Sequence, residues 1–97
     1  MRLLCQYILR NPLHAIAIGK IVITLYREGN LKISVYADHN PPHFHVVTPE
    51  GESVVDLSTM MEIRSGANRK LVVKAIQWAL KNQPLIEAEW NRLNTKR

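Results

Sequence analysis

The alternation of apolar and polar residues in the first half of the chain constrains the fold more than any other feature. Apolar residues recur at every second position in residues 20–26 and again in residues 31–36, and many of them are β-branched. A period of two is that of a strand. In the first segment the alternating sets are Ile21, Ile23 and Leu25 on one side and Lys20, Val22, Thr24 and Tyr26 on the other. Between the two segments, Glu28-Gly29-Asn30 predicts a hairpin, because Gly and Asn tolerate the positive φ of tight turns.

Three further strands are predicted downstream, in residues 43–48, 53–57 and, as a short segment, 60–63. In the first of them the period of two puts His43 and His45 on one face and Phe44 and Val46 on the other. Consecutive prolines just before it exclude a helix, so the chain is expected to reverse direction there through a turn.

Two helices are predicted after the strands. The first begins at about Arg69, and its apolar stripe is Leu71, Val72, Ala75, Ile76, Ala79 and Leu80. The second begins near Pro84, which a first turn tolerates, and its buried side is Leu85, Ile86, Trp90 and Leu93. Strands followed by helices predict an α+β fold, a small antiparallel sheet of three to five strands packed by two C-terminal helices.

The length of 97 residues is that of one domain. We expect an N-terminal extension in residues 1–18, irregular or a short helix, and a single α+β domain in residues 19–97. Cys5 is the only cysteine, so no internal disulfide can form, which fits a reducing cytosol. No apolar run approaches the ~20 residues of a membrane span. These features predict a cytoplasmic protein without a membrane partner.

Positive charge is concentrated in the last third of the chain. The net charge is +5, yet residues 1–63 carry five Lys/Arg against six Asp/Glu, whereas residues 64–97 carry eight against two. Such a segment favours an anionic partner, either RNA or an acidic protein, with Arg69, Lys70, Lys74 and Lys81 as the candidate contacts. The alternative is a solvated helix face that serves solubility alone.

The nine residues Asp-His-Asn-Pro-Pro-His-Phe-His-Val, at positions 38–46, hold three of the four histidines. This string resembles the signature of the small bacterial proteins grouped as domain of unknown function 4160. The similarity extends over about residues 19–92 and includes Asp56 after a strand, Trp78 in a helix and Trp90 near the end. Two differences from commoner members are the longer N-terminal extension and the hairpin at residues 28–30.

The resemblance implies a small bacterial cytosolic protein, often encoded beside another small protein. That arrangement suggests a toxin–antitoxin pair, in which this chain is the toxin-like component and acts on RNA. An exposed edge strand would also allow a homodimer.

One interpretation of the histidines is a divalent-metal site. His43 and His45 share a face of their strand, His39 or Asp38 can approach from the turn, and Asp56 from the neighbouring strand. Imidazoles with a carboxylate suit zinc or another transition metal. The spacing matches no widely shared metal motif, so the sequence leaves the site open.

Two other interpretations compete with the metal site. In acid–base catalysis on an RNA phosphodiester, His39, His43 and His45 would transfer protons, and Asp38 or Asp56 would orient an imidazole. In a structural corner, His43 would pack against Tyr36 or Trp78 with its ring nitrogens satisfied by carbonyl groups. The sequence does not choose among a metal-binding domain, an RNA-directed enzyme and a non-enzymatic domain that docks an acidic partner.

Overall fold

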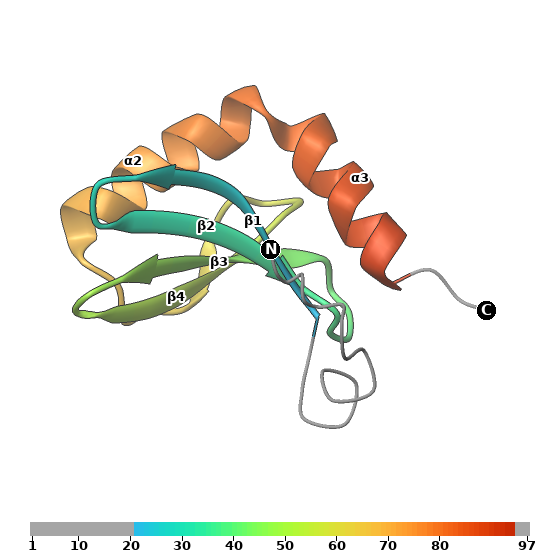
Figure 1. The fold of residues 1–97 in the computed structure, drawn as a ribbon, viewed down its shortest axis with the longest axis horizontal. Helices are drawn as coiled ribbons and strands as arrows, with labels where there is room; N and C mark the ends of the chain where they lie inside the picture. Colours follow the sequence, from blue (N-terminus) through green and yellow to red (C-terminus); the bar gives the residue numbers. More distant parts are fainter. Residues whose placement is uncertain (1–20, 95–97) are drawn as a thin grey trace, which may run out of the picture.

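The computed structural model describes residues 21–94, which form one sheet followed by two helices (Figure 1). The strands are β1 (Val22–Glu28), β2 (Leu31–Tyr36), β3 (His43–Thr48), β4 (Gly51–Asp56) and β5 (Glu62–Arg64). The helices are α2 (Arg69–Lys81) and α3 (Gln83–Asn94). The predicted α+β fold, with an antiparallel sheet and two C-terminal helices, is confirmed.

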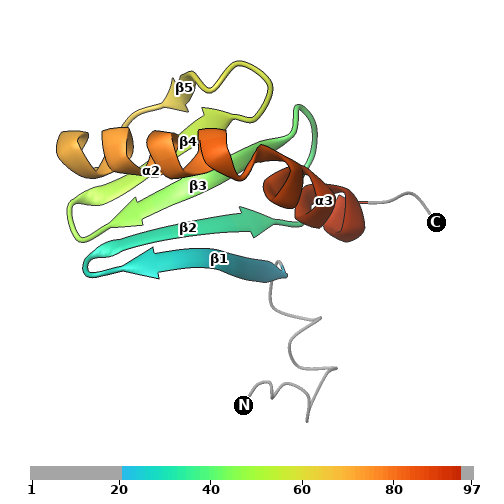
Figure 2. The ribbon, with the colours of Figure 1, turned by 90° about the horizontal axis from the view of Figure 1, so that it is seen from above.

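The strands lie side by side in the order in which they occur along the chain, β1-β2-β3-β4-β5, and each pair is antiparallel (Figure 2). β3 is therefore the central strand. Val46 of β3 pairs with Ile33 on one side and with Ser53 on the other. Because a slip of one residue would move every buried side chain of β3 to the opposite face, pairing on both sides fixes which residues reach the core.

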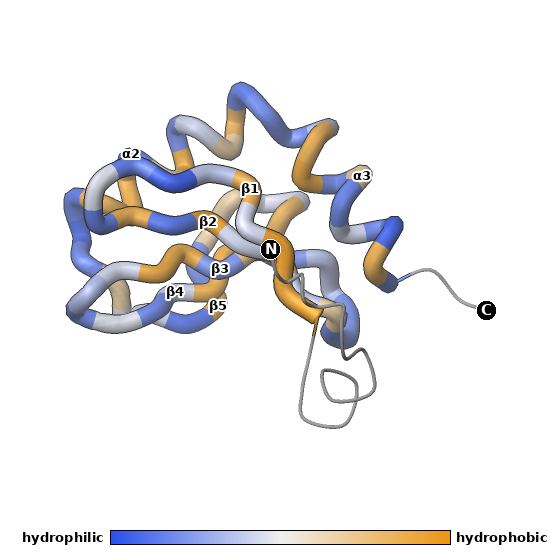
Figure 3. The backbone as a smooth tube through the Cα atoms, in the orientation of Figure 1, coloured by the Kyte–Doolittle hydropathy of each residue, from blue (hydrophilic) through white to orange (hydrophobic). Residues whose placement is uncertain are grey.

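Both helices lie on the same side of the sheet, and α3 slopes past its end towards the β2–β3 loop (Figures 1 and 2). Hydrophobic and hydrophilic positions alternate along the strands (Figure 3). The fully buried core side chains of the strands and helices are Leu31, Ile33, Val35, Phe44, Val46, Val55, Ala75, Ala79 and Ile86. The core thus fills the space between one face of the sheet and the two helices.

The apolar stripes of the two helices are narrower than predicted. Leu80 and Leu85 are 58% and 44% exposed, so the expectation that they are buried is wrong. The adjacent residues Ala79 and Ile86 are fully buried, as expected. Because successive residues are about 100° apart around a helix, Leu80 and Leu85 point away from the buried side. Small residues at the contact allow α2 to approach the sheet closely, which leaves Leu80 on the outer side.

A β-bulge changes the facing of β1. Thr24 pairs with Ser34 and Tyr26 with Ile33, so Leu25 is an extra residue in the strand. The predicted alternation is therefore interrupted here, and Leu25 and Tyr26 both pack against the core. The Tyr26 ring stacks on Trp78 of α2 at a centroid distance of 4.8 Å. An unpaired residue of this kind cannot be read from a period of two.

The start of α2 is anchored to the β3–β4 hairpin by buried hydroxyl groups. Ser53 Oγ, fully buried, accepts hydrogen bonds from the backbone N–H of Gly66 (3.1 Å) and Ala67 (3.0 Å). Thr48 Oγ1 accepts from the N–H of Asn68 (3.1 Å), and the Asn68 side chain in turn caps the helix. These contacts satisfy backbone donors that precede the first helical turn.

The predicted extension, residues 1–18, lies outside the described residues. Within residues 21–94, neither helix has the length and apolar character needed to cross a lipid bilayer.

The anchoring of α2 predicts a stability effect for Ser53→Ala. The substitution leaves the buried N–H of Ala67 without an acceptor, so we expect the free energy of unfolding to fall by about 1–3 kcal/mol. Ser58→Ala is the matched control, because the exposed Ser58 hydroxyl donates to Asp56 and, unlike that of Ser53, accepts from no buried N–H group. Its loss should change stability by less than about 0.5 kcal/mol. Urea unfolding measures both, and equal effects would contradict the anchoring role.

Candidate metal centre

The β2–β3 loop carries the signature residues to the end of the sheet beside α3. Asn94, the last residue of α3, accepts a hydrogen bond from the backbone N–H of Asp38 (2.8 Å) and donates one to the carbonyl of Tyr36 (3.3 Å). The peptide bond between Asn40 and Pro41 is cis. The helix therefore fixes the backbone from which the Asp38 carboxylate enters the corner.

His43 and His45 lie next to each other at the start of β3, and each is only 7% exposed. Their ring centroids are 5.3 Å apart. The His43 ring also contacts Trp90 of α3 at 4.9 Å, and the His45 ring contacts Tyr36 at 3.9 Å. The expectation that His43 packs against Tyr36 or Trp78 is thus corrected, since its aromatic neighbour is Trp90 and Tyr36 belongs to His45.

The Nδ1 atoms of both rings are engaged with hydrogen-bond acceptors. Nδ1 of His43 lies 2.8 Å from the carbonyl oxygen of Pro41, and Nδ1 of His45 lies 3.2 Å from Oε1 of Glu52. A carbonyl or carboxylate oxygen can only accept, so each Nδ1 carries the hydrogen and donates it. In the neutral form of each ring, the lone pair therefore resides on Nε2.

The two Nε2 atoms lie near the carboxylate of Asp38. Nε2 of His43 lies 3.3 Å from Oδ2 of Asp38. Nε2 of His45 is buried and has no hydrogen-bond partner among the described residues. One possible ligand atom from each of the three residues lies within 4.8 Å of the others. We call Asp38, His43 and His45 the corner cluster, a group that could hold a metal ion.

Burial determines the protonation of His45. Loss of water around the ring lowers the pKa of His45 below its usual 6.5, an effect that the hydrogen bond and charge of Glu52 oppose in part. Burial, with the Glu52 carboxylate as a lesser cause, raises the pKa of the Tyr36 hydroxyl above 10.0. Near neutral pH, His45 is therefore a neutral ring flanked by a neutral phenol.

The other two residues considered as ligands lie at different places. The side chain of His39 is 92% exposed, and its Nδ1 lies 2.9 Å from Oδ1 of Asp38 at the outer rim of the corner. Oδ1 of Asp56 accepts hydrogen bonds from the backbone N–H groups of Ser58 (2.8 Å) and Thr59 (3.1 Å). The Ser58 hydroxyl, which donates to the same oxygen at 2.8 Å, is the largest cause of the lowered pKa of the Asp56 carboxyl, and the backbone N–H groups add to it. The structure therefore brings Asp38, rather than Asp56, into the group with His43 and His45.

Sequence reasoning missed the partners that orient the imidazoles. Glu52 belongs to β4, Trp90 and Asn94 belong to α3, and none of them adjoins the signature along the chain. One available signal was parity, because Glu52 lies four residues before Asp56 in the strand and therefore on the same face. The helix contacts depend on where α3 ends, which no local pattern specifies.

A pocket of about 280 Å³ opens beside the corner cluster. Its lining includes the corner cluster, together with Val54, Ile63 and Arg64 from β4 and β5. Arg64 is exposed, and it was not among the residues singled out from the sequence. The corner cluster thus borders a space that admits solvent or a small ligand.

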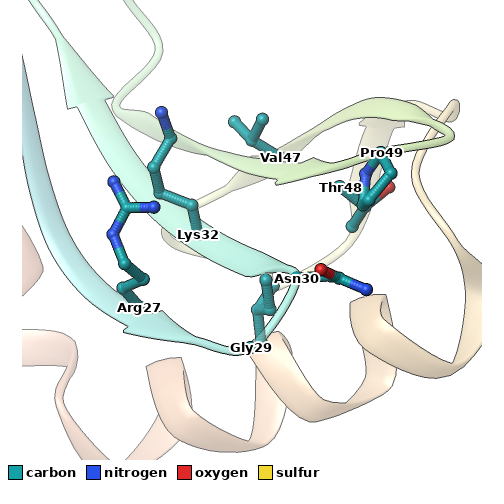
Figure 4. Close-up of a pocket in the computed structure, with 8 residues that line it drawn as sticks. Arg27, Gly29, Asn30, Lys32, Val47, Thr48 and Pro49 are labelled. Atoms are coloured by element: carbon teal, nitrogen blue, oxygen red, sulfur yellow. The ribbon is translucent and has the colours of Figure 1, made fainter.

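A second hollow, of about 330 Å³, lies at the turns that join β1 to β2 and β3 to β4 (Figure 4). Arg27 and Lys32 project on the same side of the hairpin in this view, and they are paired across β1 and β2. None of the residues predicted to form a site lines this hollow.

The basic residues of α2 differ in their availability to a partner. Arg69 forms two hydrogen bonds to the Glu62 carboxylate, at 2.8 and 2.6 Å, and Lys74 Nζ lies 3.3 Å from Oε2 of Glu28. Lys70 and Lys81 are exposed and form no ion pair within the part of the chain that the structure describes. Two of the four predicted contacts are thus already matched by carboxylates of the sheet.

Fold and site together define a small α+β domain whose sheet carries a histidine–aspartate corner. The family model described as Domain of unknown function (DUF4160) matches residues 21–91. The chain therefore belongs to this family, as the resemblance of the signature predicted. No curated protein and no solved structure gave a significant match to the chain. Its activity has to be argued from the geometry of the site.

The Glu62–Arg69 ion pair, which joins β5 to α2, predicts a pH-dependent stability difference. Arg69 lowers the pKa of Glu62 from 4.5 to about 2, so the pair stabilises the fold fully above pH 4.5 and progressively less as the pH falls towards about 2. Because Arg69 is exposed, we expect Glu62→Gln to reduce the free energy of unfolding by only about 0.5–1 kcal/mol near neutral pH.

Urea unfolding of the wild type and Glu62→Gln between about pH 7 and about pH 3 measures this difference. Glu50→Gln, in the exposed turn between β3 and β4, is the control and should leave stability unchanged. A difference between wild type and Glu62→Gln that keeps its size down to about pH 3 would contradict the assignment to this ion pair.

Proposed function

We propose that this protein binds a divalent transition-metal ion, with zinc as the best fit, through Asp38, His43 and His45. The observation that carries the proposal is the orientation of the two imidazoles. Each ring donates its Nδ1 hydrogen to a carbonyl or carboxylate oxygen, which leaves Nε2 as the ligand atom. Metal-binding histidines almost always have such a partner on the second nitrogen, because it fixes the tautomer and the orientation of the ring.

The imidazole of His45 is unsatisfied in a purely structural corner. Its buried Nε2 has no partner among the described residues, a condition that costs about 1–3 kcal/mol. The Nε2 lone pair of a neutral His43 faces the Asp38 carboxylate, and two acceptors at 3.3 Å repel each other unless a cation or a proton lies between them. One divalent ion would provide a partner for the Nε2 atoms of both imidazoles.

The distances support tetrahedral coordination. Two ligand atoms at ~2.1 Å from a zinc ion, separated by a tetrahedral angle, are ~3.4 Å apart. The observed separation of His43 Nε2 from Asp38 Oδ2 is 3.3 Å, and the whole set lies within 4.8 Å. Binding would therefore draw the three atoms together by a small rotation of side chains, without a change in the strand.

The choice of metal follows from the ligand types. Two imidazoles and one carboxylate suit zinc and other first-row transition ions better than Mg²⁺ or Ca²⁺, which prefer oxygen ligands. An ion held by three protein ligands keeps a position open for water or for a substrate atom, as in catalytic zinc sites. The pocket beside the corner cluster gives that position access to a ligand.

The competing functions have less support. RNA cleavage by acid–base catalysis needs a run of basic residues that follows the RNA backbone, yet Arg64 is the one Lys or Arg in the lining of the pocket beside the histidines. Arg69 and Lys74 are matched by Glu62 and Glu28. The role of a toxin-like component with a co-encoded partner rests on the family resemblance alone. Docking of an acidic protein rests on the charge of the C-terminal segment. We therefore favour the metal-binding domain.

The proposal predicts that metal-stripped, tag-free protein binds one equivalent of Zn²⁺ in isothermal titration calorimetry. At a free concentration ~100-fold above Kd, bound zinc adds ~2.7 kcal/mol to stability, enough to raise Tm by roughly 10 °C or more. Asp38→Asn and His45→Gln should each weaken zinc binding by about tenfold or more, since even loss of an outer partner of a ligand costs ~10–100-fold. The affinity for zinc should also decrease as the pH is lowered, because protons compete with the metal for the imidazole nitrogens.

Asp56→Asn is the matched control, because it makes the same chemical change as Asp38→Asn at a carboxylate outside the corner cluster. We expect zinc affinity within about threefold of wild type for this variant, well below the tenfold effect of a lost ligand. Wild-type protein that takes up no zinc, and whose Tm does not rise when zinc is added, would contradict the proposal. Cleavage of RNA by the metal-stripped protein, lost in His45→Gln, would favour acid–base catalysis instead.

A further inference from the structure

We infer that the metal centre takes an anionic oxygen group, a phosphate or a carboxylate, as its exogenous ligand, and that Arg64 is the second point of contact for that group. This inference rests on the proposed metal site and names the class of ligand that would occupy its open position. It depends on the placement of Arg64 relative to the corner cluster, on the charges around Arg64 and on the lining of the pocket between them.

The pairing of the strands puts Arg64 on the face that carries the corner cluster. Ser34 pairs with His45, His45 with Val54, and Val54 with Arg64, so these residues form one row across β2, β3, β4 and β5. Directly paired residues of antiparallel strands project to the same face. His45 and Arg64 are separated by two strand spacings, or about 10 Å between backbones. A long Arg side chain and a small metal-bound group can span that distance.

The charge of Arg64 is not matched by a carboxylate of the described residues. Two acidic groups of β4 and β5 are engaged elsewhere, since Glu62 binds Arg69 and Glu52 accepts from His45. Asp38, which lines the same pocket, lies against His43. No ion pair joins Arg64 to any residue in the described range, 21–94, although its side chain lines the pocket. A guanidinium beside a metal site, open to solvent, suits recognition of phosphate or carboxylate through a pair of parallel hydrogen bonds.

The lining of the pocket separates these two charged contacts by an apolar surface. Val54, between His45 and Arg64 in the row, is 7% exposed and forms part of the pocket with Ile63. A polar group placed there has no partner on the sheet between the metal and the guanidinium. An anion large enough to cross this surface contacts both the metal ion and the Arg64 guanidinium, whereas a water molecule contacts only one of them. The arrangement therefore favours an anionic oxygen group over a neutral ligand.

The test uses Co²⁺-loaded, full-length protein, because the visible spectrum of cobalt reports a new ligand on the metal. The probes are phenylphosphonate and benzoate, which present a phosphate-like group and a carboxylate on the same ring, with benzyl alcohol as the neutral comparison. We expect at least one of the two anions to change the cobalt spectrum and to bind in calorimetry, and benzyl alcohol to do neither. The anion with the tighter binding identifies the source of the oxygen group.

Variants locate the second contact. Arg64→Ala should weaken binding of that anion by about ten- to a hundredfold, the usual effect of losing a hydrogen bond to a charged group, while Arg64→Lys should recover part of it. Arg27→Ala is the matched control, since Arg27 is also an exposed arginine of the sheet but lines the other hollow. It should leave anion binding unchanged, and all three variants should keep wild-type affinity for the metal.

The outcomes separate the two claims. Protein that binds cobalt or zinc but neither anion, or an Arg64→Ala variant that binds the anion as tightly as wild type, overturns this inference and leaves the metal site intact. Protein that binds no metal overturns the proposed function, and this inference falls with it. An equal loss of affinity in Arg64→Ala and Arg27→Ala shows only a general charge effect and overturns the role of Arg64.

Discussion

The register of the central strand β3 is the constraint on which the rest of the structure depends. Hydrogen bonds to β2 and β4 hold it on both sides, and its alternating side chains serve two purposes. Phe44 and Val46 fill the core under the helices, while His43 and His45 are brought together on the other face. Because a slip of one residue would bury the imidazoles in the core and expose Phe44, the stability of the fold and the geometry of the site are inseparable.

The site also requires that the Asp38 carboxylate be placed accurately beside the imidazoles. Residues at the end of α3 determine this placement. Asn94 of α3 forms hydrogen bonds to Tyr36 and Asp38 at the start of the β2–β3 loop, and Trp90 of the same helix packs against the His43 ring. α3 thus does more than cover the sheet. It determines where Asp38 lies, and we expect changes at the end of α3 to affect the corner cluster over a long distance in sequence.

Much of the fold was accessible from the sequence, because strand alternation, turn residues and helical spacing are local properties. The same parity argument put His43 and His45 on one face. It failed at Tyr26, where a bulge adds a residue to β1, and at Leu80 and Leu85, where the width of the buried stripe depends on how closely a helix approaches the sheet. The site was less accessible, because Glu52, Trp90 and Arg64 meet the histidines only through pairing and packing of distant segments.

X-ray absorption at the zinc edge of reconstituted protein would identify the atoms that bind the ion. We predict two imidazole nitrogens at ~2.0–2.1 Å and a carboxylate oxygen at ~2.0–2.2 Å, with the imidazole scattering reduced in His45→Gln. A zinc shell made only of water and carboxylate oxygens, or one unchanged in that variant, would contradict this prediction.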